Sequence, residues 1–442
     1  RVEEVPFDSD RKMMSTKYKM HGVNHILTKG ALDSILDRCV SIATKDGIRP
    51  ITDEDKAEIS RVNREYSEQG LRVLTFAYKE SDEALTVDTE NDYTFIGLVS
   101  MIDPPREESK QAVADAIRAG IKPVMITGDH KITASAIAKQ IGIFNDGDIA
   151  VTGLELDAMS DKELDEKIEK ISVYARVSPE NKIRIVEAWQ RKGNIVSMTG
   201  DGVNDAPALK KADIGVAMGI TGTEVSKDAA SMILTDDNFS TIVAAVRQGR
   251  GIFENIKKTV HFLLSCNIGE IITVLAAFLM RLPTPLLAIQ LLWVNLVTDS
   301  LPALALGVEP VDEDIMKKPP TDAKKSLFAG GMTYSIAIEG CFIGMISLLA
   351  FTIGRVFFDG AGAPAAGRTM AFAVLSCSQL IHAFNVRSEK SLFEIGIFGN
   401  LKMLYSFLVC LALQVSVISI PALSAVFKTV SLNMVQWLVV AG

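Results

Sequence analysis

The hydrophobicity of this chain changes abruptly near residue 250, and that change limits the possible folds more than any other feature of the sequence. Up to about residue 240 the chain is charged and alternates short apolar runs with amphipathic stretches, as folded soluble domains do. Beyond residue 250 it contains apolar segments, most of them near the roughly 20 residues that a helix needs to cross a bilayer. These segments are Val260–Met280, Leu286–Val308, Met332–Gly354, Met370–Val386 and Leu401–Ile420. Another begins at Met434, so we expect a soluble part followed by five full transmembrane helices and the start of a sixth.

The composition excludes several other classes of protein. The 442 residues suggest about three domains, and the net charge of −8 argues against a nucleic-acid binder, which needs a basic face. The five cysteines form no CxxC pair, which argues against a disulfide framework and a structural zinc site. The chain begins at Arg1 without a targeting pattern, and we read it as an interior piece of a longer polypeptide.

Short apolar runs in the charged part predict β-strands at residues 97–99, 123–126, 173–175 and 194–198. The stretches between these runs carry apolar residues at helical spacing. This alternation favours a parallel α/β sheet with its active edge at the carboxyl ends of the strands. Two of these ends carry matching tripeptides, Thr127–Asp129 and Thr199–Asp201. The sequence therefore indicates candidate functional loops at this edge.

The second loop continues as Thr199–Lys210, with the sequence TGDGVNDAPALK, and its residue types suit a site for phosphate and Mg²⁺. Its glycines let the backbone approach an anion closely, and the helix expected after it favours negative charge at its N-terminus. Asp201 and Asp205 supply hard oxygen ligands for Mg²⁺, while Thr127 offers a hydroxyl and Lys182 a positive charge. A lone TGD tripeptide is a plain turn about as often as it is a functional loop. The longer run Thr199–Lys210 is much less often a plain turn.

The run from Thr199 to Lys210 resembles the hinge motif of P-type cation-transporting ATPases, whose phosphorylation domain has the haloacid-dehalogenase fold. Three further motifs follow the order of that family: Asp103–Arg106 (DPPR), Thr127–Asp129 (TGD) and Ala175–Pro179 (ARVSP). The resemblance implies a multidomain chain with three parts. These are the C-terminal part of an α+β nucleotide-binding domain (1–95), an α/β haloacid-dehalogenase-like phosphorylation domain (96–240) and an α-helical transmembrane bundle (241–442).

The resemblance also implies which soluble residues act on ATP and Mg²⁺. The catalytic set would comprise Thr127, Gly128, Asp129, Lys182, Asp201, Asn204 and Asp205. Within it, Asp201 would hold Mg²⁺, and Thr127 and Lys182 would contact the transferred phosphoryl group. The nucleotide site would comprise Phe7, Lys12, Lys29, Gly30, Arg72 and Arg176. Phe7 would stack on adenine and Arg72 would reach the phosphates, although each of these nucleotide motifs alone is as typical of an ordinary strand or turn.

Two motifs of the family do not occur in this sequence. The phosphorylated aspartate belongs to a DKTGT sequence, and the dephosphorylating glutamate belongs to a TGE loop. The resemblance implies that both lie upstream of Arg1, together with the first four membrane helices. We therefore expect this fragment to be inactive alone, because it lacks the nucleophile, and to work with the missing N-terminal part of the same pump.

Polar side chains gather in the first two apolar segments, where hydrocarbon normally excludes them. Asn267 and Glu270 lie three residues apart, on one face of a helix, and Asn295, Thr298 and Asp299 are likewise clustered by helical spacing. Carboxylate and amide oxygens at membrane depth usually mark an ion path, and an all-oxygen ligand set favours Ca²⁺ or another hard cation. A structural polar network between helices is the alternative interpretation.

The resemblance narrows the ion to Ca²⁺. The segments around Glu270 and Asp299 are similar to calcium pumps, whereas Gln379 stands where two-site calcium pumps carry a glutamate. We therefore expect one Ca²⁺ per ATP, released away from the cytoplasm in exchange for protons, with Glu270 either a ligand or the titrating carboxylate. Pro302 should loosen its helix and free backbone carbonyls. For Glu339 no family role is known, and helix packing, proton linkage and a snorkelling surface position all fit.

The same resemblance predicts a multi-pass protein of a bacterial plasma membrane, with ATP, Ca²⁺ and the lipid bilayer as partners and with cytoplasmic soluble domains. Lys257, Lys258 and Arg387 are expected to anchor helix ends on the cytoplasmic side. The alternatives are a pump for Mn²⁺ or another cation, a membrane-tethered phosphatase of the dehalogenase fold, and a non-catalytic regulatory fragment. Buried Glu270 and Asp299 argue against the phosphatase, because a tether needs neither carboxylate.

Overall fold

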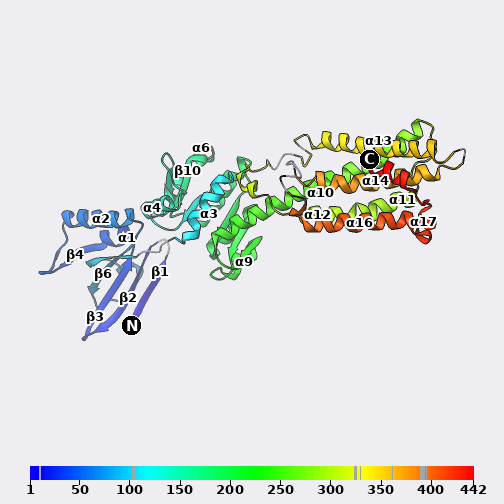
Figure 1. The fold of residues 1–442 in the computed structure, drawn as a ribbon. Coiled ribbons are helices and arrows are strands. Elements are labelled where there is room, and N and C mark those ends of the chain that lie inside the picture. The colour runs from blue at the N-terminus through cyan, green and yellow to red at the C-terminus, as the bar shows by residue number, and fades with distance from the viewer. Residues whose placement is uncertain are drawn as a thin grey trace. The chain divides into compact units, whose positions relative to one another are not determined.

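The structure is a computed structural model that describes residues 1–8, 11–101, 105–322, 326–328, 330–360, 362–388, 394 and 396–442 (Figure 1). The chain divides into two compact units, Arg1–Val243 and Ala244–Gly442. Parts of two expected motifs lie outside the described residues: Asp103 and Pro104 of the DPPR motif, and the two residues 9–10 between Phe7 and Lys12.

A mostly antiparallel sheet of seven strands forms the N-terminal part of the first unit. Its order is β1 (Glu3–Asp8), β2 (Met13–Met20), β3 (Val23–Gly30), β6 (Arg72–Glu80), β7 (Tyr93–Met101), β4 (Cys39–Thr44) and β5 (Gly47–Pro50). Helices α1 (Leu32–Ile35) and α2 (Asp53–Glu68) both contact β6. The run at 97–99, expected in the parallel sheet, instead lies in β7 and pairs antiparallel with β6. Alternate residues of β7, Tyr93 and Phe95, point into the core of this seven-stranded sheet, which explains the pairing.

The rest of the first unit contains two parallel sheets of three strands each. Their orders are β8 (Met125–Thr127), β10 (Ile171–Ala175), β9 (Ile149–Thr152), and β11 (Ser197–Gly200), β12 (Ile214–Met218), β13 (Met232–Leu234). The helices are α3 (Glu107–Arg118), α4 (Lys131–Ile141), α5 (Gly153–Asp157), α6 (Asp161–Lys167), α7 (Pro179–Arg191), α8 (Ala206–Lys211) and α9 (Glu224–Ala229). The strands expected at 123–126, 173–175 and 194–198 correspond to β8, β10 and β11, and each is parallel to its neighbours.

Two local features bring the functional loops of the parallel sheets into place. Ile126 of β8 packs with Met198 of β11 and Leu209 of α8 in one hydrophobic cluster. This cluster joins the two sheets next to the strand ends that carry the TGD tripeptides. Helix α7 begins sharply because Ser178 caps it, accepting a hydrogen bond from the Asn181 N–H (3.2 Å), and because Pro179 is suited to the first helical turn.

The second unit is helical. Its elements are the long α10 (Phe239–Leu279), α11 (Ala288–Trp293), the π-helical η5 (Val294–Thr298), α12 (Ser300–Gly307), η6 (Glu313–Lys317), α13 (Met332–Phe357), α14 (Ala365–Asn385), η7 (Ile397–Gly399), α16 (Leu401–Ser419), α17 (Pro421–Phe427) and α18 (Met434–Ala441). Within the described residues, four stretches are long and apolar enough to cross a membrane. They are Phe239–Leu279, Ala288–Gly307, Met332–Phe357 and Leu401–Ser419.

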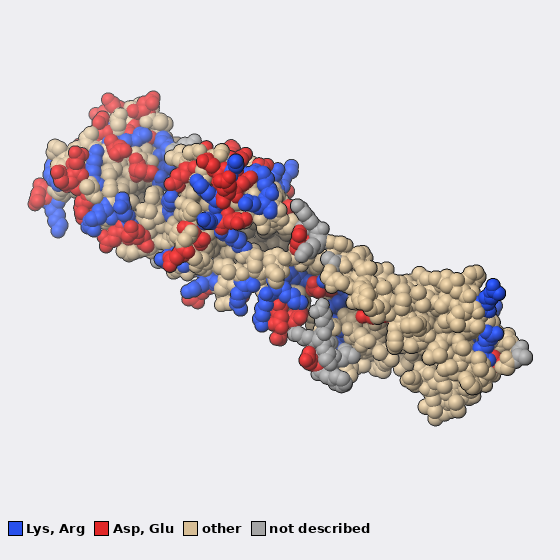
Figure 2. All heavy atoms as spheres, turned by 90° about the horizontal axis from the view of Figure 1, so that it is seen from above, with Lys and Arg blue, Asp and Glu red and all other residues tan. Residues whose placement is uncertain are grey.

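Helix α14 differs from these four stretches. It has 21 residues, yet it is not among the four, and most of its side chains are buried within the unit. Burial among neighbouring helices allows α14 to carry polar residues that lipid-facing positions exclude. On the face shown in Figure 2, charged side chains are dense over the first unit, whereas the helices of the second unit expose mainly uncharged residues.

Arg387 lies just beyond the end of α14, and its side chain does not extend toward a membrane surface as expected. It is 1% exposed and pairs with Glu309 (Nη2–Oε1, 2.8 Å). The second oxygen of Glu309 accepts a hydrogen bond from Asn400 Nδ2 (2.5 Å). Because Glu309 follows α12 and Asn400 precedes α16, this buried pair joins the ends of α12, α14 and α16.

Candidate functional site

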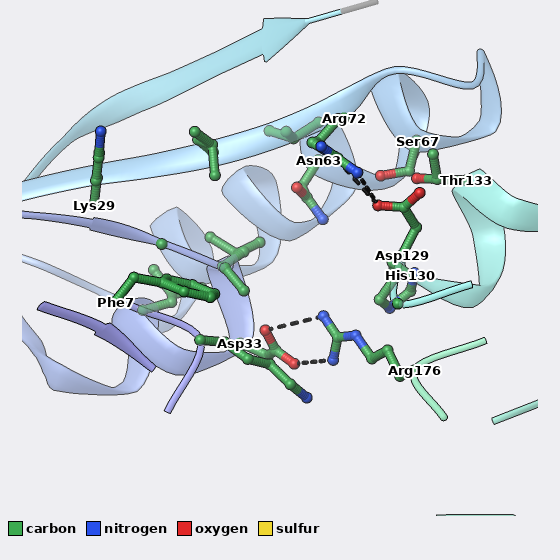
Figure 3. Close-up of a pocket in the computed structure, with 18 of the residues that line it drawn as sticks. Phe7, Lys29, Asp33, Asn63, Ser67, Arg72, Asp129, His130, Thr133 and Arg176 are labelled. Carbon is green, nitrogen blue, oxygen red and sulfur yellow. Dashed lines mark hydrogen bonds and ion pairs between the residues drawn. The ribbon is translucent and has the colours of Figure 1, made fainter. Parts of the chain in front are cut away.

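A cavity of about 870 Å³ in the first unit gathers most of the expected soluble site residues (Figure 3). It lies between the seven-stranded sheet and the loop that follows β8. The cavity is lined by every residue expected at the nucleotide site and by one stretch of the catalytic set: Phe7, Lys12, Lys29, Gly30, Arg72, Arg176, Thr127, Gly128 and Asp129. The other catalytic candidates, on α7 and after β11, do not line it.

One wall of the cavity is shaped by the strand ends of the seven-stranded sheet. Phe7 is 63% exposed, so its ring offers an apolar face to a flat ligand. Gly30 at the end of β3 lies so close to the neighbouring backbone that an added Cβ would stand 2.4 Å from Lys12 O. Only glycine fits there, and Lys12 itself has a positive φ of 56°. These two residues hold the basic edge of the cavity in a fixed backbone geometry.

Two arginines in the cavity are each paired with a carboxylate (Figure 3). Arg72 Nη2 lies 2.5 Å from Asp129 Oδ1, and Arg176 Nη1 lies 2.5 Å from Asp33 Oδ2. Burial opposes ionisation of Asp33, but the hydrogen bond and positive charge of Arg176 outweigh it and hold the pKa of Asp33 below its ordinary value. Burial, followed by the charge of Arg176, lowers the pKa of His130, so this imidazole is neutral at pH 7. Each of the two arginines in the cavity therefore has its charge balanced by a neighbouring carboxylate.

Several residues lining this cavity were not predicted from the sequence. They are Asp33, Asn63, Ser67, His130 and Thr133, all visible in Figure 3. Asn63 and Ser67 lie four residues apart on α2, and His130 directly follows Asp129, so helical spacing and adjacency to a motif were available signals. Asp33 lies three residues after Gly30 of the expected nucleotide site, but nothing in the sequence indicates its pairing with Arg176.

The loop after β11 forms a second, separate constellation. Asp205 is buried, and its Oδ2 accepts hydrogen bonds from the N–H groups of Asp201 (3.3 Å) and Gly202 (3.1 Å). Its other oxygen accepts a charged hydrogen bond from Lys182 Nζ (2.5 Å) on α7. The side chains of Asp201 and Asn204 are exposed, and within the described residues neither has a hydrogen-bond partner, so Asp205 is the side chain that organises the loop.

In the second unit the expected cation ligands fall into two groups. Both oxygens of Glu270 on α10 accept hydrogen bonds from Asn295 Nδ2 of the π-helical segment (3.1 and 2.9 Å). Asp299 is 1% exposed, and neither carboxylate oxygen accepts a hydrogen bond from a nitrogen or oxygen donor of the described residues. The nearby Cys266 thiol is only a weak donor. Gln379 is likewise fully buried, and its Oε1 has no partner among the described residues.

The other two expected ligands, Asn267 and Thr298, direct their hydrogen-bond donors to backbone carbonyls of their own helices. Asn267 is exposed, and its Nδ2 donates to Leu263 O (2.7 Å) one turn earlier on α10. Thr298 is buried, and its hydroxyl donates to Val294 O (3.0 Å). The structure thus joins Glu270 with Asn295 and leaves Asp299 and Gln379 with unsatisfied oxygens.

The helix that carries Asp299 changes its hydrogen-bonding pattern at this point. Residues Val294–Thr298 are π-helical, and the Asp299 N–H bonds to Val294 O (2.9 Å), five residues earlier. Sequence analysis predicted loosening from Pro302, and the irregular turn lies just before that proline. Single π-helical turns are frequent at functional sites because they redirect side chains and carbonyl groups. Here the irregular turn contains Asn295 and Thr298 and directly precedes Asp299, three of the five residues expected to bind the ion.

The chemistry of these oxygens fits a hard cation. An ionised carboxylate buried without donors is costly, and a bound cation is one way to compensate it. Among the described residues, no group of three or more His, Cys, Asp and Glu side chains could hold a metal ion. The side-chain oxygens of Glu270, Asn295 and Asp299 are hard donors, which suit Ca²⁺ better than soft metals.

Comparisons with known proteins agree with this geometry. A family model described as "P-type ATPase, cytoplasmic domain N" matches residues 1–108, and one described as "Cation transporting ATPase, C-terminus" matches residues 283–442. "Calcium-transporting ATPase 1" of Bacillus cereus is 51% identical over 99% of this chain and 51% of its own length. "Calcium-transporting ATPase" of Bacillus subtilis is 44% identical over 100% of this chain and 50% of its own length. "Calcium-transporting ATPase type 2C member 1" of Homo sapiens is 39% identical over 100% of this chain and 47% of its own length.

The two family matches and these relatives show that the chain belongs to the P-type cation-transporting ATPases, and its four apolar helices fit a partly membrane-embedded fragment of such a protein. Within that family, the bacterial proteins that it resembles at 44–51% identity carry the name of calcium-transporting ATPases. The chain spans about half the length of the curated relatives that it matches.

Proposed function

We propose that the complete protein to which this chain contributes is an ATP-driven pump that moves Ca²⁺ out of the cytoplasm. The observation that carries the proposal is Asp299, whose buried carboxylate has no nitrogen or oxygen donor among the described residues and lies near Glu270 and a π-helical turn. A structural polar network would satisfy such oxygens with donors from neighbouring helices. A transported cation explains why they are left free, and the names of the relatives favour Ca²⁺.

The soluble unit supplies the chemistry of phosphoryl transfer in this proposal. Positioning and charge neutralisation do most of the catalysis in such reactions. Nucleotide binds in the cavity, with Phe7 against the base and Arg72 near the phosphates. Asp201 holds Mg²⁺, which neutralises phosphate charge when bound, and Lys182 reaches the phosphoryl group from its position beside Asp205. This arrangement corresponds to a phosphorylation domain of the haloacid-dehalogenase type.

The nucleophile of this reaction comes from another part of the protein. In the described residues β8 and β11 are edge strands, each paired with one neighbour, although Ile126 and Met198 on them share a hydrophobic cluster. Unpaired edges held this close are suited to an inserted strand. We infer that the N-terminal part of the pump supplies that strand and, at its carboxyl end, the aspartate that is phosphorylated.

The proposal also covers the number of Ca²⁺ ions moved per ATP and the membrane in which the protein lies. Gln379 replaces the glutamate of a second site, so one Ca²⁺ moves per ATP, and protons return in exchange. The protein lies in a bacterial plasma membrane, with the soluble unit in the cytoplasm and ATP and Mg²⁺ drawn from there.

The test is ATP-driven uptake of ⁴⁵Ca²⁺ by the complete protein in sealed vesicles, measured with ATP hydrolysis. We expect uptake of one Ca²⁺ per ATP and no loss of that ratio in Gln379→Ala. Uptake of ⁵⁴Mn²⁺ but not ⁴⁵Ca²⁺ would replace the ion while preserving the pump. Hydrolysis that no cation stimulates would overturn transport altogether and favour a tethered phosphatase.

A further inference from the structure

Three ionisable side chains from three helices meet in the second unit, apart from the expected cation ligands. Glu339 on α13 lies between two histidines: its Oε2 is 2.5 Å from His261 Nε2 on α10 and 3.6 Å from His382 Nε2 on α14. Ser265, one turn after His261, also places its hydroxyl 3.5 Å from the same oxygen. We call His261, Glu339 and His382 the His–Glu–His cluster.

The two histidines of the cluster are largely shielded, whereas the side chain of Glu339 is 36% exposed. The side chains of His261 and His382 are 19% and 7% exposed, and Phe262 stacks on the ring of His382 with centroids 6.0 Å apart. Among the described residues, His382 Nε2 is buried without a hydrogen-bond partner, although it lies just beyond bonding distance of Glu339. A buried ring nitrogen in that position is costly unless it gains a partner. A small approach to Glu339 would satisfy it.

The composition of the cluster suits one extra proton. A carboxylate with two neutral imidazoles has a net charge of −1, and in a poorly polarisable environment that charge is unfavourable. One added proton converts an imidazole to imidazolium and makes the cluster neutral, whereas a second would leave a net positive charge. The cluster is not a metal centre, because none of the described His, Cys, Asp and Glu side chains form a group of three with the spacing for a metal ion.

Other charged groups of the second unit have electrostatic partners of their own. On α10, Lys258 precedes His261 by one turn and interacts with Glu254, Glu309 and Asp312. Asp299, directly before α12, interacts with Glu270 and Cys266, and Glu309, just after α12, is paired with Arg387. On α16, Lys402 lies in a groove with residues of α12. Among the described residues, Glu339 forms ion pairs only with the two histidines of the cluster.

The helices of the cluster are packed tightly against the segment that carries the cation ligands. A Cβ on Gly340, next to Glu339, would lie 2.5 Å from Ile268 Cγ2 and 2.9 Å from Ser265 O. One turn further, a Cβ on Gly344 would lie 2.9 Å from Gly269 O. Helix α13 therefore lies directly on the α10 backbone on both sides of Asn267 and Glu270. A change in the contact between Glu339 and α10 is therefore transmitted to Asn267 and Glu270 through the backbone contacts between α13 and α10.

Helix α14 provides a second route. Gln379 Nε2 donates to Cys266 O on α10 (3.5 Å), and His382 lies three residues further along the same helix. His382 thus contacts α10 at Phe262, and Gln379 contacts it at Cys266, one turn further along. Movement of His382 toward Glu339 would shift the helix that carries Gln379.

We propose that the His–Glu–His cluster is a proton-binding site that takes up one proton and is linked through α13 and α14 to the cation site. Its effect on transport rests on the proposed function, whereas its protonation does not. One linked proton changes apparent cation affinity by at most about tenfold per pH unit.

The experiment uses the complete protein in detergent, labelled with ¹⁵N-histidine, and follows the ring signals by nuclear magnetic resonance from pH 5.5 to 8.5. His261→Asn and His382→Asn assign the two signals. We expect the two rings to take up one proton between them in this range, with a midpoint that shifts in Glu339→Gln and stays in place in the exposed-histidine control His21→Asn. Rings that do not titrate, or a midpoint indifferent to Glu339→Gln, would overturn the proposal.

A second measurement tests the linkage to the cation site. The Ca²⁺ concentration for half-maximal ATP hydrolysis is measured from pH 6 to pH 8 in the wild type, Glu339→Gln, His382→Asn and His21→Asn. In Glu339→Gln and His382→Asn, we expect the change in this Ca²⁺ concentration between pH 6 and pH 8 to differ from that of the wild type by about threefold or more. This difference is within the limit for one proton. Superimposable curves would disprove the linkage. If the wild type shows no Ca²⁺ stimulation, the proposed function fails, and the ring titration still decides the proton site.

Discussion

Single residues decide how the cavity of the soluble unit meets a ligand. Arg72 and Arg176 are each neutralised by a carboxylate, so an incoming triphosphate has to compete with Asp129 and Asp33 for the guanidinium groups. Both ion pairs are partly exposed, so each contributes little to stability. Replacing the carboxylate partner of an arginine by a phosphate group therefore costs little free energy. A more highly charged ligand, such as a triphosphate, can therefore displace the carboxylates from the two arginines.

Removal of one competing carboxylate should tighten nucleotide binding. In Asp33→Asn, Arg176 is free of its partner and one negative charge facing the phosphates is lost. Because exposed ion pairs are worth about 0.2–1 kcal/mol, we expect the dissociation constant of the complete protein for ATP to fall by at most about fivefold. Calorimetry measures this, with exposed Asp46→Asn as the control. Weaker binding in Asp33→Asn would mean that Asp33 itself holds the nucleotide.

The effect of Asp33→Asn should be independent of pH near neutrality. The pKa of Asp33 is held below its ordinary value by Arg176, so the pair persists above that ordinary value and is lost only as the pH falls through the lowered one. His130 has a lowered pKa and is already neutral above its ordinary value. The ratio of ATP affinities of Asp33→Asn and wild type should therefore be equal at pH 6.5 and pH 8.5. A ratio that changes with pH would assign a titrating group to this pair.

Residue patterns predicted the members of the cavity better than their partners. The motifs that contain Phe7, Lys29 and Thr127 indicated residues that surround one cavity, because each motif has a recognisable order of residue types. The partner of Arg176 could not be predicted, since Asp33 is 143 residues away and its sequence is that of an ordinary helix start. The neighbours of Glu339 escaped prediction for the same reason: His261 and His382 lie on other helices.

At the scale of elements, helix packing in the membrane unit depends on residues without side chains. Gly269, Gly340 and Gly344 let α10 and α13 approach until backbone and side chain touch. Small residues commonly allow such approach between membrane helices, where packing rather than the hydrophobic effect drives association. This contact supports the segment with Asn267 and Glu270.

A methyl group at this contact should therefore be harmful. In Gly340→Ala the new Cβ would stand 2.5 Å from Ile268 Cγ2, so the helices have to separate. Overpacking of this kind costs about 1–3 kcal/mol, and we expect a lower midpoint of thermal unfolding together with weaker cation binding. Gly249→Ala on α10 is the matched control, because nothing lies within 4 Å of its added Cβ. Equal midpoints for the two variants would contradict close packing of α10 and α13.

The buried pair at the ends of α12, α14 and α16 makes a different prediction. Arg387→Met leaves the Glu309 carboxylate buried without its cation, which should cost about 3–5 kcal/mol. The double variant Arg387→Met, Glu309→Gln removes both charges and should recover much of that loss. Thermal unfolding of the complete protein in detergent measures both effects. If the double variant is no more stable than Arg387→Met, the pairing with Glu309 is not the source of the loss.

The sequence predicted the positions of these helices but not their detailed form. Apolar length indicated α10, α13 and α16, since crossing hydrocarbon requires a fixed number of apolar residues. The π-helical turn at Val294–Thr298 was indicated only indirectly, by Pro302. The buried position of Arg387 was missed because a basic residue at a helix end is usually a surface anchor, and only the fold brings Glu309 beside it.

For the whole molecule, the change in hydrophobicity near residue 250 coincides with the division into two compact units at Val243 and Ala244. The alternation of strands and helices predicted parallel sheets, and β8, β10 and β11 are parallel. The same alternation wrongly predicted that residues 97–99 belong to a parallel sheet, whereas they lie in the antiparallel sheet. Pairing of distant strands depends on which core their alternate residues enter, and local patterns do not contain that information.

The central claim is that Asp299 binds a transported Ca²⁺ whose presence triggers ATP hydrolysis. The most direct test is Ca²⁺-stimulated hydrolysis by the complete protein, beside Asp299→Asn and the exposed control Glu313→Gln on η6. We expect the wild type and Glu313→Gln to respond alike, and Asp299→Asn to need about a hundredfold more Ca²⁺ or to lose the response, because loss of one partner of a buried charged contact costs about 3 kcal/mol or more. An unchanged Ca²⁺ response in Asp299→Asn would contradict the account.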